Sequence, residues 1–270
     1  MTGAPALPPL REIIKTYGLG AKKSLGQHFL LDTNLTGRIA RTAGELGDKH
    51  VVEIGPGPGG LTRSILAQGP RSLTVIERDQ RCIDALRELQ TAYPETLLIL
   101  EADAMNVDLS VLDPRPSVII SNLPYNVGTA LLIKWLNGVD GIERMILMFQ
   151  TEVAERIAAR PGTGSYGRLA ILTQWLCETR ILFNVDKRAF TPPPKVMSTV
   201  IEIVPRARPL AEAELSKLEN VTRAAFGQRR KMLRSSLKSL GINPEDAGIK
   251  PERRAEELTI EEFCALARLI

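Results

Sequence analysis

Short apolar segments rich in β-branched residues recur along the chain and alternate with segments whose apolar positions follow a helical rhythm. The apolar segments predict seven strands, and the segments between the earlier strands predict helices. We expect strands at residues 50–54, 73–77, 97–100, 116–120, 145–150, 178–184 and 197–204. The last two resemble a hairpin. The pattern therefore predicts an open α/β sheet.

The patterning changes at Pro205-Arg206-Ala207-Arg208-Pro209. Beyond this segment the chain shows helical periodicity and no strand pattern. An i, i+3, i+4 spacing is followed by Leu215, Leu218, Val221, Thr222 and Ala225. We therefore expect two domains, an α/β domain over residues 1–205 with an N-terminal arm, and a small helical domain over residues 206–270.

Composition narrows the setting in which the protein works. Of 270 residues, 44% are hydrophobic and 24% charged, which is ordinary for a soluble globular protein. No apolar run is long enough to span a bilayer, and the N-terminus lacks a signal-peptide core. The three cysteines are widely spaced and have no metal-ligand spacing. We expect a cytoplasmic protein with no membrane segment, no disulfide framework and no metal site.

The segment Ser121-Asn122-Leu123-Pro124-Tyr125 follows the strand expected at 116–120. Ligands of open α/β sheets bind at the carboxyl ends of strands. Asn122 offers an acceptor oxygen there, Pro124 restrains Leu123 to an extended conformation, and Tyr125 offers a stacking face. This combination suits a flat heterocycle with an exocyclic amine, such as adenine. The alternative is a plain turn with a half-buried tyrosine.

A glycine-rich segment links the first strand to the next helix. Gly55, Gly57 and Gly60 satisfy the spacing G-x-G-x-x-G after a strand and before a helix, which favours a nucleotide-like cofactor. Glu77 follows 20 residues after Gly57, at the end of the next strand. A carboxylate at this position accepts ribose hydroxyls. Asp103 follows the third strand and either binds an adenine amine or serves as a helix N-cap.

Basic residues gather in the helical region. The segment from Phe226 to Lys238 contains five cations and no acid. Like charges this close repel one another unless an anion relieves them, so contact with phosphate is favoured over a merely solvated helix face. Two further lysines, Lys22 and Lys23, precede the Gly26-to-Leu30 segment. The mild excess of four cations over the whole chain is consistent with a polyanionic partner.

Taken together and in this order, these motifs resemble one family along nearly the whole chain. The segments that carry the resemblance are 26–30, 53–60, Glu77, Asp103, 122–125, 190–196 and 226–231. The chain is similar to the small-subunit ribosomal RNA adenine dimethyltransferases of the KsgA type. The resemblance implies a Rossmann-like, seven-stranded class I methyltransferase domain with a small C-terminal helical domain. It also implies S-adenosylmethionine as cofactor and dimethylation of adjacent adenines near the 3′ end of 16S rRNA.

The resemblance also assigns residues to roles. His28, Leu30, Gly55, Glu77, Asp103 and Asn122 are expected to line the cofactor site, although many relatives have asparagine in place of His28. Asn122 and the Leu123 carbonyl are expected to accept the amine hydrogens of a flipped adenine, which orients its lone pair. Tyr125 and Phe190 are expected to sandwich the base. With Pro124, these residues form the expected catalytic set. The expected RNA contacts are Lys22, Lys23, Lys195, Arg229, Arg230, Lys231 and Arg234.

Several alternatives remain open. A large-subunit rRNA methyltransferase of the macrolide-resistance type would use the same chemistry, but Leu123 and the 190–196 segment fit the small-subunit group better. A DNA adenine methyltransferase lacks support because no separate base-reading domain is evident. A nicotinamide-dependent oxidoreductase would share the glycine turn, and a non-catalytic assembly factor would share the fold. We expect a monomer that acts on the assembling small ribosomal subunit.

Overall fold

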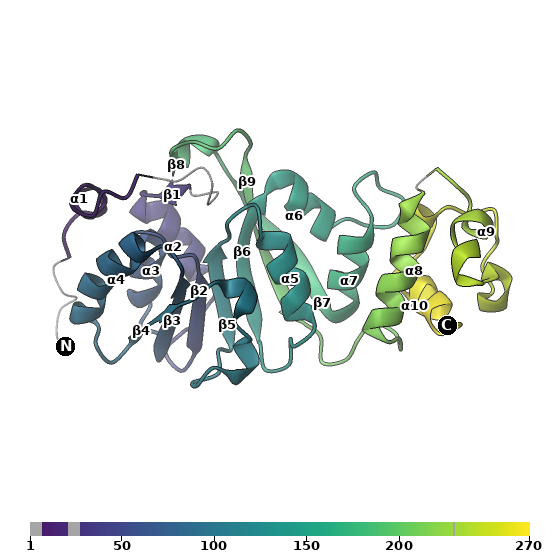
Figure 1. The fold of residues 1–270 in the computed structure, drawn as a ribbon, viewed down its shortest axis with the longest axis horizontal. Helices are drawn as coiled ribbons and strands as arrows, with labels where there is room; N and C mark the ends of the chain where they lie inside the picture. Colours follow the sequence, from purple (N-terminus) through teal and green to yellow (C-terminus); the bar gives the residue numbers. More distant parts are fainter. Residues whose placement is uncertain (1–6, 21–27, 229) are drawn as a thin grey trace. The chain divides into compact units, whose positions relative to one another are not determined.

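The computed structural model describes residues 7–20, 28–228 and 230–270 (Figure 1). These residues contain a seven-stranded sheet with the strand order β4-β3-β2-β5-β6-β9-β7. Every predicted strand is present, with ends within about two residues of those expected. The strands are β2 (His50–Ile54), β3 (Ser72–Glu77), β4 (Leu97–Glu101), β5 (Val118–Asn122), β6 (Arg144–Gln150), β7 (Cys177–Val185) and β9 (Ser198–Pro205).

The strand order creates a natural ligand site. Strands β2 to β6 pair in parallel, and β9 joins β6 in the antiparallel sense. The chain builds outward from β2 through β3 to β4 and then returns to the other side of β2 with β5. Loops that leave the carboxyl ends of β2 and β5 therefore diverge, and such a switch point leaves a crevice between them.

Helices connect the parallel strands, and their boundaries follow local capping. In α2 (Thr33–Arg41), the Asp32 side chain accepts hydrogen bonds from the backbone N–H groups of Asn34 and Leu35. Asp79 caps α4 in the same way through Arg81. The helices in this part of the chain are α1 (Leu10–Thr16), α2, α3 (Gly60–Leu66), α4 (Gln80–Ala92) and α5 (Gly128–Leu136).

A second, two-stranded sheet was not predicted. Strand β1 (Phe29–Leu30) pairs with β8 (Phe190–Thr191) in the antiparallel sense, with Leu30 opposite Phe190. Two residues are too short to show an alternating pattern, so periodicity could not reveal either strand. The consequence is functional, because this pairing brings the 28–30 segment next to residues that lie about 160 positions later in the chain.

The chain divides into two compact units. One contains residues 1–151 and 182–203, and the other contains residues 152–181 and 204–270. The predicted boundary at 205/206 lies near the third crossing between the units, at 203/204. The difference concerns residues 152–181, which we expected in the α/β domain and which cluster with the C-terminal residues. Local periodicity predicted their helices but carries no information about the surface against which a helix packs.

The second unit is mainly helical and has its own aromatic core. Helix α8 (Leu215–Gly227) buries Leu218, Val221, Thr222 and Ala225, four of the positions that the helical spacing identified. The Phe226 ring stacks on Phe263 with 5.7 Å between ring centroids. The remaining helices of this unit are α6 (Thr151–Ile157, whose first residue belongs to the other unit), α7 (Arg168–Leu176), α9 (Leu233–Ser236) and α10 (Ile260–Ala267). Among the described residues, no helix is both long and apolar enough to cross a membrane.

Candidate active site

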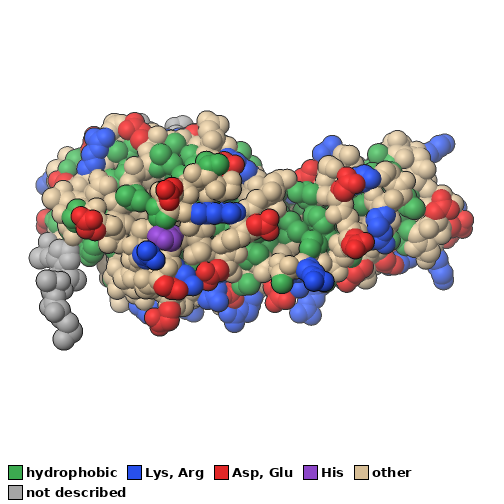
Figure 2. Space-filling view, turned by 90° about the horizontal axis from the view of Figure 1, so that it is seen from below, with side chains coloured by type: hydrophobic (Ala, Val, Ile, Leu, Met, Phe, Trp, Pro, Cys, Tyr) green, Lys and Arg blue, Asp and Glu red, His purple; other side chains and the backbone are tan. Residues whose placement is uncertain are grey.

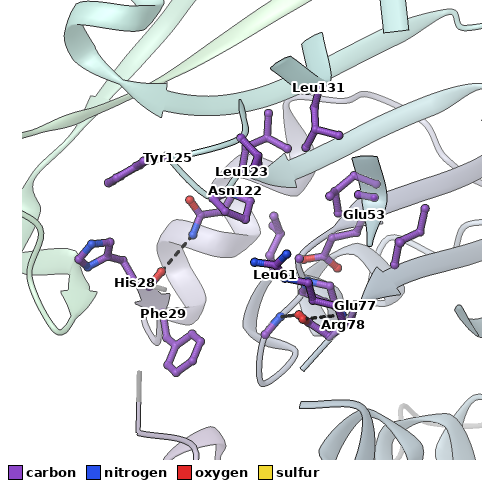
Figure 3. Close-up of a pocket in the computed structure, with 18 of the residues that line it drawn as sticks. His28, Phe29, Glu53, Leu61, Glu77, Arg78, Asn122, Leu123, Tyr125 and Leu131 are labelled. Carbon is purple, nitrogen blue, oxygen red and sulfur yellow. Dashed lines mark hydrogen bonds between the residues drawn. The ribbon is translucent and has the colours of Figure 1, made fainter. Parts of the chain in front are cut away.

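A cavity opens at the carboxyl ends of β2, β3 and β5, where the strand order predicts a ligand site (Figure 3). The structure brings together in its wall all six residues that we expected to bind the cofactor: His28, Leu30, Gly55, Glu77, Asp103 and Asn122. Leu123, Pro124 and Tyr125 line the same cavity. Segments separated by almost a hundred positions in the sequence thus form a single site.

The glycine turn after β2 allows close approach of the backbone. Gly55 and Gly57 have φ angles of +63° and +55°, which side chains other than glycine rarely adopt. A Cβ atom on Gly57 would lie 3.0 Å from the Phe29 ring, and one on Gly60 would collide with the Leu30 carbonyl oxygen. The absence of side chains at these positions allows β1 to pack closely against the glycine turn and the start of α3.

Glu77 is held firmly at the end of β3. Its Oε1 accepts hydrogen bonds from the backbone N–H groups of Arg78 and Asp79, at 2.8 and 2.9 Å, and its Oε2 accepts one from Gly57 at 3.2 Å. Burial raises the pKa of the Glu77 carboxyl, and the three backbone donors oppose that shift. A carboxylate has about four acceptor positions, so only one remains free. Acceptance of both hydroxyls of a ribose would require release of the longest bond, the one from Gly57.

Asp103 already has two partners. Its Oδ1 accepts from the backbone N–H of Met105 at 2.9 Å, as an N-cap does, and its Oδ2 accepts from Arg78 Nη1 at 2.7 Å. The Met105 hydrogen bond first, and then Arg78, hold the pKa of Asp103 below its ordinary value. Asp103 is therefore an N-cap that also lines the cavity, and its contact with an adenine amine stays a prediction. Each oxygen keeps a lone pair for a ligand amine.

Asn122 stands at the end of β5 with its amide orientation fixed. Its Nδ2 donates a hydrogen bond of 3.2 Å to the His28 carbonyl oxygen (Figure 3). This contact uses the donor side of the amide and leaves Oδ1 as an acceptor at the cavity. His28 is itself anchored, because its Nδ1 donates to the Pro192 carbonyl at 2.8 Å. The β1–β8 pairing thus supports the orientation of Asn122.

Tyr125 and Phe190 occupy different environments. The Tyr125 hydroxyl shares a hydrogen bond of 2.5 Å with Ser198, and burial raises its pKa. Phe190 is only 2% exposed, packs in the hydrophobic core and does not line the cavity. The Phe190 ring is therefore not placed at the cavity wall, where stacking on a base beside Tyr125 would require it. The pairing of Leu30 with Phe190 directs this ring into the core, and the aromatic ring near Tyr125 is His28, at 5.5 Å between centroids.

Sequence reasoning assigned no role to three charged residues around the cavity. Glu53, in β2, is 2% exposed and accepts a hydrogen bond of 2.7 Å from the Thr62 hydroxyl. Burial raises its pKa to about 8. Arg78 bridges to Asp103, and Lys134 of α5 donates to the segment that follows Asp103. The only sequence signal was for Glu53, an acid within an otherwise apolar strand; charged residues at strand ends and on helices are usually solvated.

The predicted RNA contacts lie on exposed surface where the structure describes them. Lys195, Arg230, Lys231 and Arg234 are all exposed. Arg234 Nη1 lies 3.9 Å from Glu252 Oε1, so the Arg234 charge is partly compensated. Lys22, Lys23 and Arg229 lie outside the described residues. Acidic and basic side chains are interspersed on the face drawn in Figure 2, so overall charge on that face does not mark a binding surface.

Comparisons with known proteins identify the relatives of this chain. The family model for "Ribosomal RNA adenine dimethylase" matches residues 18–270. The chain is 60% identical over 268 residues to "Ribosomal RNA small subunit methyltransferase A" of Paramagnetospirillum magneticum, covering 98% of this chain and 95% of the relative. It is 56% identical over 272 residues to the protein of the same name from Rhodospirillum rubrum, covering 100% of this chain and 94% of that protein.

Solved structures share the fold. A dimethyladenosine transferase from Plasmodium falciparum superposes with a TM-score of 0.75 at 24% identity, covering 88% of this chain and 96% of that one. The 23S rRNA methyltransferase ErmE gives a TM-score of 0.67 at 30% identity, covering 89% and 98%. The predicted Rossmann-like methyltransferase fold is thereby confirmed. The glycine turn, the Asn122-to-Tyr125 segment and a family match over nearly the whole length lead to one conclusion: the chain belongs to the ribosomal RNA adenine dimethylase family.

Proposed function

We propose that this enzyme dimethylates the N6 amines of adjacent adenines near the 3′ end of 16S rRNA during assembly of the small ribosomal subunit. The observation that carries this proposal is the fixed amide of Asn122 at the carboxyl end of β5. Its donor side is bound to the His28 carbonyl oxygen, so an acceptor faces the cavity. An acceptor in this position matches an adenine amine, which has two hydrogens to donate.

As a ribosomal RNA adenine dimethylase, the chain is a methyltransferase whose cofactor is S-adenosylmethionine. When bound, this cofactor supplies a methyl group carried on a positively charged sulfur. Loss of the methyl group would leave that sulfur as a neutral thioether. The residues present fit the cofactor. Glu77 keeps one acceptor position for a ribose hydroxyl, and Asp103 keeps lone pairs for the adenine amine.

The chain's own groups then orient the target base. Asn122 Oδ1 and the Leu123 carbonyl accept the two amine hydrogens, which draws the nitrogen toward tetrahedral geometry and turns its lone pair to the cavity. The Tyr125 ring, held by Ser198, offers a face for stacking worth about 1–3 kcal/mol. The carboxyl groups that line the cavity, those of Glu53, Glu77 and Asp103, are already hydrogen-bonded, which is consistent with catalysis by orientation rather than by a general base.

The proposal that the substrate is small-subunit RNA rests on sequence identity to relatives. The relatives at 56–60% identity carry small-subunit names, whereas the 23S rRNA methyltransferase ErmE is 30% identical. This difference favours small-subunit RNA over the large-subunit alternative that the sequence left open. Family membership sets the nicotinamide-dependent alternative aside. We further propose that the protein acts as a monomer in the cytoplasm on an assembling particle, with Lys195, Arg230 and Lys231 near RNA phosphates.

The test is to map modified adenines by mass. Small-subunit particles that lack adenine methylation are incubated with the protein and isotope-labelled S-adenosylmethionine, and the RNA is then digested and sequenced by mass spectrometry. Two labelled methyl groups on each of two neighbouring adenines of 16S rRNA are expected, with no label in 23S rRNA treated in parallel. Label confined to 23S rRNA, or to an atom other than N6, contradicts the proposal.

A further inference from the structure

Lys134 makes an unusual set of contacts for a helical lysine. It lies in α5, its side chain is half-buried, and its Nζ donates hydrogen bonds to the carbonyl oxygens of Met105 and Val107, both at 2.7 Å. A third carbonyl oxygen, that of Ala104, lies at 3.4 Å. An ammonium group has three donors, and all three are directed at one short stretch of backbone. Within the described part of the chain no carboxylate pairs with this Nζ, so its contacts are with backbone carbonyl groups.

The stretch that Lys134 holds is a wall of the cavity. Residues 104–106 form a single turn of 3-10 helix that begins at its N-cap, Asp103. Asp103, Ala104 and Met105 all line the cavity. Asp103 fixes the start of the turn through the Met105 N–H, and Lys134 binds the carbonyl groups at its end. The turn is therefore held from both sides, and its position depends on α5.

Helix α5 is in turn fixed against the target-base segment. A Cβ atom on Gly128, its first residue, would lie 3.3 Å from Leu123 Cβ and 3.2 Å from the Phe149 ring. Leu131, one turn further, lines the cavity. One rigid helix thus contacts the Asn122-to-Tyr125 segment at its start and holds the Asp103 turn through Lys134. The two walls are set by the same element.

We propose that Lys134 is a positioning residue that places Asp103 to accept the adenine amine of the cofactor and so sets the enzyme's discrimination for adenine. The inference rests on the proposed placement of the cofactor adenine beside Asp103. The Lys134 charge acts in the same direction, because it adds to the Met105 hydrogen bond and Arg78 in holding the Asp103 pKa low. Asp103 remains an ionised acceptor, and its turn keeps its place in the cavity wall.

The experiment measures binding of two ligands by calorimetry: S-adenosylhomocysteine, and S-inosylhomocysteine, in which a carbonyl replaces the adenine amine. The wild-type protein is expected to bind the first more tightly, by about tenfold, since the carbonyl that replaces the adenine amine cannot donate to Asp103. Lys134→Met removes the three donors while keeping an unbranched side chain. It is expected to lose about tenfold in affinity for S-adenosylhomocysteine and to bind S-inosylhomocysteine as the wild type does.

Controls separate positioning from general support. Lys49→Met removes a lysine that pairs with the carboxylates of Asp48 and Glu143, and it should leave both affinities unchanged. Lys134→Arg keeps the charge but not the compact three-donor geometry, so its discrimination should lie between those of the wild type and Lys134→Met. If Lys134→Met fails to fold, Lys134→Arg alone still decides the question. Amide exchange in residues 104–107 should be faster in both Lys134 variants.

Three outcomes would overturn the proposal. Equal losses for both ligands would mean that Lys134 only supports the structure, and unchanged affinities would mean that the turn needs no tether. A wild-type protein that binds both ligands equally would remove Asp103 from adenine recognition. Failure of the wild type to bind either ligand would instead contradict the cofactor site itself, which is a separate result.

Discussion

The cofactor cavity and the basic segment of the second unit, residues 226–238, differ in whether their charged side chains have partners within the chain. The three carboxyl groups that line the cavity have partners within the chain: Glu53 with Thr62, Glu77 with three backbone N–H groups, and Asp103 with Arg78. At the basic segment, Arg230 and Lys231 are exposed, and the described residues provide neither of them with an ion pair. The first region is organised before a ligand arrives, whereas the second has charges that only a partner would neutralise.

This difference determines what a substitution should do. Loss of a partnered group in a cavity leaves another polar group without a hydrogen-bond partner. It also displaces atoms that must stay within a fraction of an ångström of their productive positions. Loss of an exposed cation removes one contact from a sum of screened interactions. We therefore expect large, specific effects in the cavity and small, salt-dependent effects at the basic segment.

The largest effect is expected at Asn122. Asn122→Ala removes the acceptor for the target amine, and kcat for methyl transfer should fall by about 10²- to 10³-fold, the cost of losing one preorganised polar contact. Affinity for S-adenosylhomocysteine should weaken only about threefold. Single-turnover methylation and calorimetry measure the two quantities. The exposed Asn137 provides a matched control, because Asn137→Ala should change neither. Unchanged turnover in Asn122→Ala would contradict the orienting role.

The next effect concerns stability and pH at Glu53. Its folded pKa of about 8 lies above the ordinary value of 4.5, so between these values the folded protein keeps a proton that the unfolded chain releases. The free energy of unfolding should therefore fall as pH rises from 5 to 8, by up to about 1.4 kcal/mol per unit from this group. Glu53→Gln should lessen that slope, as measured by urea unfolding at several pH values.

The exposed Glu45 supplies the comparison for this measurement. Glu45→Gln should leave the dependence of unfolding free energy on pH as it is in the wild type. A Glu53→Gln protein whose unfolding free energy falls with pH as steeply as the wild type would show that Glu53 is ionised in the folded protein. In that case the Thr62 hydrogen bond would outweigh burial.

A smaller effect is expected at Glu77. In Glu77→Gln an amide group replaces one carboxylate oxygen, so that position no longer accepts from Gly57 or from a ribose hydroxyl. Affinity for S-adenosylhomocysteine should fall by about 10- to 30-fold, which corresponds to about 1.4–2 kcal/mol. Glu101, at the end of the neighbouring strand and exposed, is the matched control. Equal affinity in wild type and Glu77→Gln would remove the carboxylate from cofactor binding.

Local patterns predicted the elements well because local chemistry decides them. Asp32 and Asp79 cap helices through their own neighbours in the sequence, so the starts of α2 and α4 were readable from sequence. The glycine turn and Asn122 were also predictable, since each follows an apolar strand directly. Parallel strands carry their carboxyl ends to one edge, and this rule brought segments far apart in sequence into one predicted site.

What sequence could not reveal depends on long-range contact. Phe190 was expected at the base, but its register opposite Leu30 buries it in the core. Arg78 and Lys134 looked like ordinary surface cations, and their roles follow only from the approach of residues 25 to 30 positions away. The two-residue strands β1 and β8 have no pattern to detect. Each failure concerns a side chain whose environment is made by another part of the chain.

The smallest effect is expected at the basic segment. It tests most directly whether the exposed cations there act differently from the partnered groups of the cavity. A plot of log affinity for small-subunit RNA against log salt concentration should become shallower by about 1.5 when Arg230 and Lys231 are replaced by alanine. Each phosphate contact that is lost reduces the number of counterions released on binding. At a fixed moderate salt concentration, affinity should fall only several-fold. Filter binding from 50 to 300 mM salt would measure this slope.

A control of equal charge makes the result specific. Arg87 and Arg188 are exposed arginines that already pair with Asp84 and Asp186, and replacing both by alanine removes the same formal charge. If RNA phosphates lie at the basic segment, the Arg87 and Arg188 variant should keep the wild-type slope while the Arg230 and Lys231 variant loses part of it. Equal slopes in both variants would mean that net charge alone governs binding. The contrast between an organised cavity and an unsatisfied charged surface would then hold only for the cavity.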